Sequence, residues 1–173
     1  MQTRLLERFL RYVAVTSQSD ASQAVVPSTE GQRSLAELLK KDLAELGLVN
    51  LEISEYSVLT GKLPANLPAG SGEQVPAVGF VAHLDTVDVN LSADIKPQVV
   101  RSYSGGDICL NEKKGIYLRE AEHPELLKYK GQDIVCTDGT SVLGADNKAA
   151  IANVCVHWKL WCKIKTCSTE ISM

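Results

Sequence analysis

The 173-residue sequence lacks any apolar run that approaches the roughly 20 residues needed to span a bilayer. It also lacks the apolar stretch of a secretory signal, because charged side chains interrupt its N-terminal segment. Those side chains belong to Arg4, Glu7, Arg8 and Arg11. We therefore expect a cytoplasmic protein without a membrane partner.

An excess of basic residues is absent as well. Lysine and arginine total 18 against 21 aspartates and glutamates, which gives a formal net charge of -3. A dedicated nucleic-acid-binding protein usually shows a basic excess, so we expect no nucleic-acid partner. Hydrophobic residues make up 45% of the chain and charged residues 23%. Both values are close to the averages of globular proteins, which excludes wholesale disorder.

Tryptophan is absent from residues 1–153, and only two of the five cysteines occur there. The other three cysteines and both tryptophans gather near the C-terminus, at Cys155, Trp158, Trp161, Cys162 and Cys167. An odd number of cysteines without a secretory signal argues against a disulfide framework. The sharp change in composition suggests that the tail of residues 154–173 has a different origin from the rest of the chain.

Two helices are predicted near the N-terminus. Apolar residues at helical spacing over residues 3–15, with arginines on the opposite face, predict an amphipathic helix. A second helix is expected to begin at Thr29, because Thr29 and Gln32 fit a capping box. Gly47 follows the last apolar position and predicts the end of that helix.

Strands are predicted downstream of these helices. Alternating apolar and polar residues over 49–53 predict a half-buried strand, which could pair with another over 57–63. The continuous apolar run over 77–82 predicts a strand buried on both faces of a sheet. A further short strand is expected over 133–137. Together with the helices, these elements predict the α/β class.

The remaining segments carry weaker signals. Residues 87–131 are polar, with turn-forming sequences between short strands. Pro124 fits the first position of a short helix. A third long helix is expected to begin around Asp146.

His83 and Asp85 follow the apolar run directly. In extended backbone, residues at i and i+2 project to the same face. In open α/β sheets, ligands collect beyond the carboxyl ends of the strands. A neutral imidazole is a good zinc ligand, and a neighbouring carboxylate can accept its other ring N–H and fix the tautomer. The alternative is a lone histidine with a structural hydrogen bond at a strand end, since one histidine supplies only one ligand.

Asp146 marks the second candidate position, within the segment TDGTSVLGADNKA at 137–149. It stands near the expected start of a helix, where aspartate is favoured as an N-cap. Capping is therefore the alternative to a role in chemistry for this residue.

The two segments together resemble the dinuclear-zinc aminopeptidase and carboxypeptidase superfamily, and within it the peptidase T family of tripeptide aminopeptidases. The motifs that carry the resemblance are HLDT at 83–86 and the segment at 137–149. Further similar stretches are LLERFLRYV at 5–13, VPSTEGQ at 26–32 and LPAN at 63–66. The motifs occur in the order and spacing typical of the family, and the resemblance runs from about residue 3 to about residue 153.

The resemblance implies a fold and an activity. Residues 1–153 would be the N-terminal portion of a catalytic domain, an incomplete part of a three-layer fold in which helices flank a mixed central sheet. The activity would be release of the N-terminal residue from tripeptides by zinc-activated water. Short peptides would be the substrates, and a homodimer is one expected assembly.

The resemblance also implies a role for each candidate residue. His83 would bind one zinc ion, and Asp85 would be the catalytic aspartate that orients the His83 ring. Asp146 would bridge two zinc ions, since the two oxygens of a carboxylate can serve two metals roughly 3.5–4 Å apart.

Some features of the family pattern are missing. Asn147 stands where a second aspartate is usual, and Ala150 stands where glycine is usual. The glutamate pair expected about thirty residues after Asp146 is absent, because Glu170 is the only later carboxylate residue. We expect no lid domain either. We therefore expect an inactive, truncated chain, with a tail that arises from a frameshift near Asn153.

A non-catalytic function is the alternative. The chain could be a remnant retained only as a binding or dimerisation piece. The missing glutamate pair favours this alternative, whereas the matching contexts of His83, Asp85 and Asp146 favour the enzyme.

Overall fold

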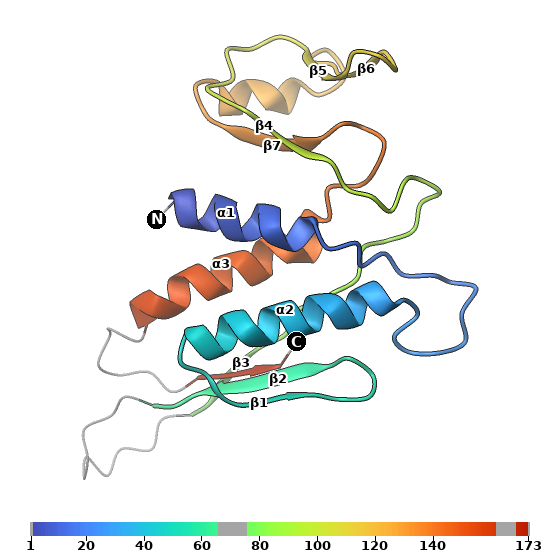
Figure 1. The fold of residues 1–173 in the computed structure, drawn as a ribbon. Helices are drawn as coiled ribbons and strands as arrows, with labels where there is room; N and C mark the ends of the chain where they lie inside the picture. The colour runs from blue at the N-terminus through green and yellow to red at the C-terminus, as the bar shows by residue number, and fades with distance from the viewer. Residues whose placement is uncertain (1, 66–75, 162–168, 173) are drawn as a thin grey trace. The chain divides into compact units, whose positions relative to one another are not determined.

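The computed structural model describes residues 2–65, 76–161 and 169–172, so Cys162 and Cys167 lie outside it (Figure 1). The chain divides into two compact units: unit 1 comprises Met1–Asp88 and Gly144–Met173, and unit 2 comprises Val89–Leu143. Both helices and strands occur, which confirms the α/β class. The three-layer arrangement stays a prediction. Among the helices in the described ranges, none is long and apolar enough to cross a membrane.

Unit 1 holds the three α-helices of the described chain and one sheet. The helices are α1 (Gln2–Val13), α2 (Glu30–Glu45) and α3 (Ala145–Trp161). The strands are β1 (Val49–Ile53), β2 (Leu59–Leu63), β3 (Val78–Phe80) and β8 (Thr169–Ser172). Helix α1 packs against α3, and α2 packs against the β1–β2 hairpin (Figure 1). The apolar faces predicted for the first two helices supply much of the core, through Phe9, Tyr12, Val13, Leu35, Leu39 and Leu43.

A buried carboxylate joins α1 to α2. Asp42 of α2 accepts a hydrogen bond of 2.6 Å from the Tyr12 hydroxyl and one of 2.7 Å from the Arg8 guanidinium. Arg11 forms an ion pair with the same carboxylate. Burial and the neighbouring carboxylate raise the pKa of Tyr12, so its phenol remains a proton donor. These contacts fix α1 against α2 at one point in the core.

The predicted capping box at the start of α2 is wrong. Thr29 makes no side-chain hydrogen bond to the first turn of α2. Its hydroxyl donates instead to the carbonyl of Gln18, at 2.8 Å. The Gln32 amide donates to the Ser28 hydroxyl rather than reaching back to Thr29. A distant backbone acceptor, the Gln18 carbonyl, has therefore replaced the local N–H donor as the partner of the Thr29 hydroxyl.

The sheet of unit 1 has the strand order β1-β2-β8-β3. Strands β1 and β2 pair in antiparallel fashion, with Ile53 opposite Leu59 and Val49 opposite Lys62. In β1, Leu51 and Ile53 are half-buried and Glu52 is exposed, as the alternation predicts, but Val49 is 43% exposed, so the prediction is wrong at the first apolar position. Strand β8 runs antiparallel to β2 and parallel to β3.

The prediction that residues 77–82 form a strand buried on both faces is wrong. Strand β3 is only three residues long, and its Val78 side chain is 46% exposed. Val81, just past the strand, is 83% exposed. A strand is buried on both faces only when layers cover both. In the part of the chain that the structure describes, β3 has β8 as its single hydrogen-bonded neighbour.

Helix α3 continues across the change in composition at residue 154 and ends at Trp161. Cys155 and Trp158 of the tail are buried in the core of unit 1. The Trp158 ring meets Phe80 of β3 edge-on, with ring centroids 6.5 Å apart. The first part of the tail therefore packs as core, while its separate origin stays a prediction.

Unit 2 is built from short antiparallel pairs. Its elements are β4 (Pro97–Val100), β5 (Ile108–Asn111), β6 (Ile116–Leu118), the 3-10 helix η1 (Pro124–Tyr129) and β7 (Ile134–Thr137). Strand β4 pairs with β7, and β5 pairs with β6. Tyr103, Ile108 and Leu126 form the buried cluster of the unit. The short helix predicted from Pro124 and the strand predicted over 133–137 are confirmed.

Candidate metal centre

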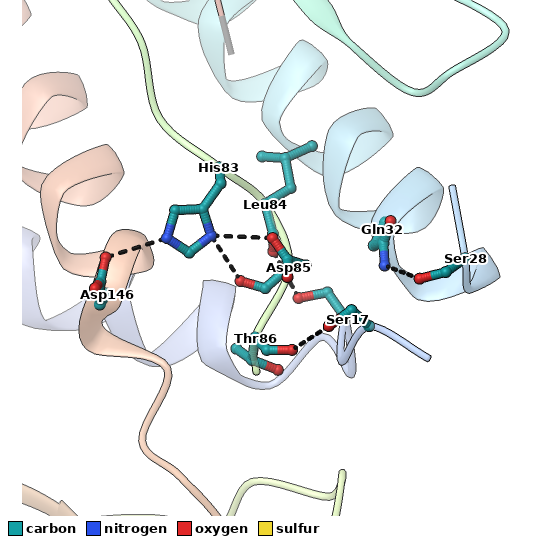
Figure 2. Close-up of polar contacts among 9 residues, drawn as sticks. Ser17, Ser28, Gln32, His83, Leu84, Asp85, Thr86 and Asp146 are labelled. Carbon is teal, nitrogen blue, oxygen red and sulfur yellow. Dashed lines mark hydrogen bonds and ion pairs between the residues drawn. The ribbon is translucent and has the colours of Figure 1, made fainter. Parts of the chain in front are cut away.

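His83 and Asp85 lie on the irregular segment that follows β3. The His83 Nδ1 atom lies 3.1 Å from the Asp85 Oδ1 atom and 3.1 Å from the Asp85 carbonyl oxygen. Both side chains are partly open to solvent, with exposed fractions of 46% and 38%. The i, i+2 spacing therefore brings a carboxylate to one nitrogen of the ring, as Figure 2 shows.

Asp146 approaches the same ring from the other side. Its Oδ1 atom lies 3.1 Å from the His83 Nε2 atom (Figure 2). The backbone of Asp146 is extended, with φ -86° and ψ 105°, so regular helix begins only at the next residue. This is the position of an N-cap, yet the carboxylate contacts His83. The structure thus brings together all three residues selected from the sequence.

The carboxylates of Asp85 and Asp146 favour the protonated form of the His83 ring. Burial lowers the pKa of the His83 imidazole, but the hydrogen bonds to Asp146 and Asp85 outweigh it, and the net pKa is raised. A protonated ring can donate to both carboxylates at once. In the neutral ring, one nitrogen is a donor and the other carries a free lone pair.

The two donors meet at hydrogen-bond distance. Ligand atoms roughly 2.0–2.2 Å from a tetrahedral zinc ion lie roughly 3.3–3.6 Å from each other. The separation of 3.1 Å between His83 Nε2 and Asp146 Oδ1 is slightly shorter, so the two atoms would have to move slightly apart to bind one zinc ion. Asp85 contacts the opposite nitrogen, which suits a partner that orients the ring.

The pair is a partial ligand set. Within the described ranges, no three or more histidine, cysteine, aspartate or glutamate side chains gather closely enough to hold a metal ion. Asp85 and Asp146 face opposite nitrogens of one ring, so they do not converge on one point. His83 and Asp146 are therefore the two direct ligands that this geometry offers.

Two residues near the site were not selected from the sequence. Ser17 is fully buried, and its hydroxyl donates to the carbonyl of Leu84 at 2.8 Å. Lys148 is also fully buried, and its ammonium donates to the carbonyl of Val15 at 2.9 Å. Burial lowers the pKa of Lys148 to about 8, against the opposing charge of Asp85. Ser17 belongs to no motif, and Lys148 lies within the segment at 137–149 without a role assigned from the sequence, so only the folded chain reveals these contacts.

Comparison with known proteins gives a consistent set of relatives, although no family model matches the chain. A peptidase T-like protein of Yersinia pestis is 51% identical over 154 residues, which is 89% of this chain and 36% of the relative. A peptidase T-like protein of Rhizobium meliloti (strain 1021) is 48% identical over 152 residues, covering 88% of this chain and 36% of the relative. Peptidase T of Geobacillus kaustophilus (strain HTA426) is 44% identical over 154 residues, with coverages of 89% and 36%. The chain thus spans about 36% of the length of these curated relatives.

Proposed function

Because this chain is a homologue of peptidase T, we propose that His83, Asp85 and Asp146 form part of a zinc-dependent peptidase site. The reaction we propose for the site is release of the N-terminal residue from tripeptides. One observation carries the proposal: the two nitrogens of a single imidazole each face a carboxylate at 3.1 Å. The relatives are named for the same class of enzyme.

Each side chain has a separate task in this proposal. His83 would hold zinc through Nε2, and Asp146 would supply carboxylate ligands to the same metal centre. Asp85 would accept a hydrogen bond from the Nδ1–H group of His83, which keeps the lone pair on Nε2. A bound zinc ion supplies Lewis acidity and lowers the pKa of a coordinated water.

The isolated chain would bind zinc weakly under this proposal. Zinc sites use three or four protein ligands, and the affinity depends on ligand number and geometry. Here only two direct ligands, His83 and Asp146, lie close together among the described residues. We therefore expect substoichiometric zinc and little hydrolysis from the chain alone.

Purified chain tests the proposal through two quantities, the zinc bound per chain and the hydrolysis of a simple tripeptide. Asp146→Ala should reduce the zinc bound at a fixed free zinc concentration. Any tripeptide hydrolysis by the wild-type chain should disappear in Asp85→Ala. An unchanged zinc content in Asp146→Ala would refute the proposed ligand pair.

A non-catalytic role is the second candidate. The small ligand set among the described residues favours it. In this case the chain would act as a binding or dimerisation piece, and sedimentation would report a dimer that zinc does not influence. Zinc-dependent hydrolysis would contradict this candidate. The cytoplasmic location expected from the sequence stays a prediction.

A further inference from the structure

The segment Val15–Ser19, here named the clasp, follows α1 and runs beside the backbone of Leu84 and Thr86. The Thr86 N–H donates to the Ser17 carbonyl at 3.1 Å, and the Ser19 N–H donates to the Thr86 carbonyl at 2.9 Å. Gln18 and Thr86 form a parallel bridge. The Ser17 hydroxyl adds the bond of 2.8 Å to the Leu84 carbonyl (Figure 2). The clasp therefore holds the backbone of the HLDT motif.

The position of Leu84 makes the Ser17 bond relevant to the site. Leu84 stands between His83 and Asp85, so its carbonyl group belongs to the peptide unit that joins Leu84 to Asp85. Ser17, Leu84 and Thr86 are buried, whereas the His83 ring is nearly half exposed. The partly exposed His83 side chain thus projects from a buried, hydrogen-bonded backbone.

The clasp is also held by the elements on its other sides. Lys148, two residues after Asp146, donates to the Val15 carbonyl. Thr29 donates to the Gln18 carbonyl. At Gly31 of α2, an added Cβ atom would lie 1.6 Å from the Thr16 carbonyl oxygen, so the helix backbone closely approaches the clasp. The clasp consequently connects the segment that carries His83 to the segment that carries Asp146.

We propose that Ser17 is a positioning residue, which sets the separation between His83 and Asp146 through the backbone of Leu84 and Thr86. This inference rests on the proposed function, because the separation matters for chemistry only if the pair binds zinc. Residues that orient metal ligands commonly change metal affinity by roughly 10–100-fold when they are replaced. A purely structural hydroxyl would change the stability of the fold and leave the zinc affinity unchanged.

The test measures zinc affinity of the full chain by competition with a chelating dye, together with the urea midpoint of unfolding. Ser17→Ala should weaken zinc binding roughly tenfold. Ser17→Thr keeps the hydroxyl and should restore most of the affinity. Thr137→Val is the matched control, because the Thr137 hydroxyl donates to the Ser141 carbonyl in the buried part of unit 2. The control should lower the urea midpoint without weakening zinc binding.

A second readout separates this inference from the proposed function. The ring nitrogen resonances of His83 in zinc-free chain report its hydrogen bonds directly. Ser17→Ala should shift them and leave those of His123 in place. If the wild-type chain binds no zinc, the proposed function fails, while the resonances still decide the role of Ser17. Unchanged His83 resonances, or equal loss of zinc affinity in Thr137→Val, would overturn the inference.

A further variant covers the case in which Ser17→Ala does not fold. Thr29→Val removes the bond to the Gln18 carbonyl and leaves the Leu84 contact untouched. It should loosen the clasp and move both readouts in the same direction by a smaller amount. Zinc affinity and His83 resonances that both match wild type would then contradict the proposed role of the clasp.

Discussion

His83 lies between two carboxylates, and each of its ring nitrogens has a different partner. The contact with Asp85 could be predicted from the i, i+2 spacing alone. The contact with Asp146 spans 63 positions of the sequence, and it was expected only through the resemblance to a known family. The bond from Ser17 could not be predicted, because a serine in a polar connection has no periodicity or motif that indicates its acceptor.

Asp85→Asn tests the orienting role of this carboxylate. The substitution removes the charge beside Nδ1, so the ring loses a strong acceptor and its preferred tautomer. Zinc affinity of the full chain should fall by roughly tenfold or more, as measured by competition with a chelating dye.

Glu125→Gln is the matched control for that substitution. Glu125 faces Nδ1 of His123 at 3.3 Å, also at i+2, but in unit 2. This control should leave the zinc affinity unchanged. Equal zinc affinity in Asp85→Asn and wild type would contradict the orienting role.

At the scale of single elements, local pattern predicted the helices and the first hairpin well. The exposure of β3 was mispredicted. An apolar run indicates that a strand is suited to burial, but it does not show which helix or sheet packs over each face. The continuation of α3 past residue 153 was also missed. The residues from Val154 to Trp161 include no glycine or proline, so the change in composition gives the helix no reason to end.

Asp42→Ala tests how α1 is fixed to α2. Removal of this buried carboxylate leaves the Tyr12 hydroxyl without its acceptor and the guanidinium groups of Arg8 and Arg11 without their counter-charge. The free energy of unfolding should fall by about 3 kcal/mol, as measured by urea denaturation.

Glu37→Ala serves as the comparison on the same helix. Its pair with Arg33 is exposed and has a separation of 3.4 Å, so its loss should cost less than about 1 kcal/mol. Similar decreases in the free energy of unfolding for Asp42→Ala and Glu37→Ala would contradict the stabilising role of the buried Asp42 contacts.

Alkylation of cysteines tests the packing of α3. Burial raises the pKa of the Cys155 thiol, although Tyr12 opposes this shift. The thiolate is the reactive form, so a raised pKa leaves less of it at pH 8, and burial also blocks access. Iodoacetamide should therefore modify Cys155 far more slowly than the exposed Cys109, with the rate rising as the pH or the urea concentration increases. Peptide mapping that finds equal rates in native chain would contradict this packing.

At the scale of the whole molecule, the sequence predicted the α/β class but not the division into two units. The long polar stretch after the HLDT motif gave weak local signals, and its small core forms from only three buried residues, Tyr103, Ile108 and Leu126. Homology to peptidase T covers 89% of the chain, whereas the chain spans about 36% of those relatives. The proposed site is built from His83, Asp85 and Asp146, which the described residues bring together.

The most direct measurement compares the zinc content of the wild-type chain with that of two single variants after equilibrium dialysis. His83→Ala removes the proposed ligand. His123→Ala removes a histidine of the same 46% exposure that also faces a carboxylate at i+2. The account predicts that His83→Ala loses most of the bound zinc, while His123→Ala retains the wild-type content. Equal zinc contents in all three chains would contradict it.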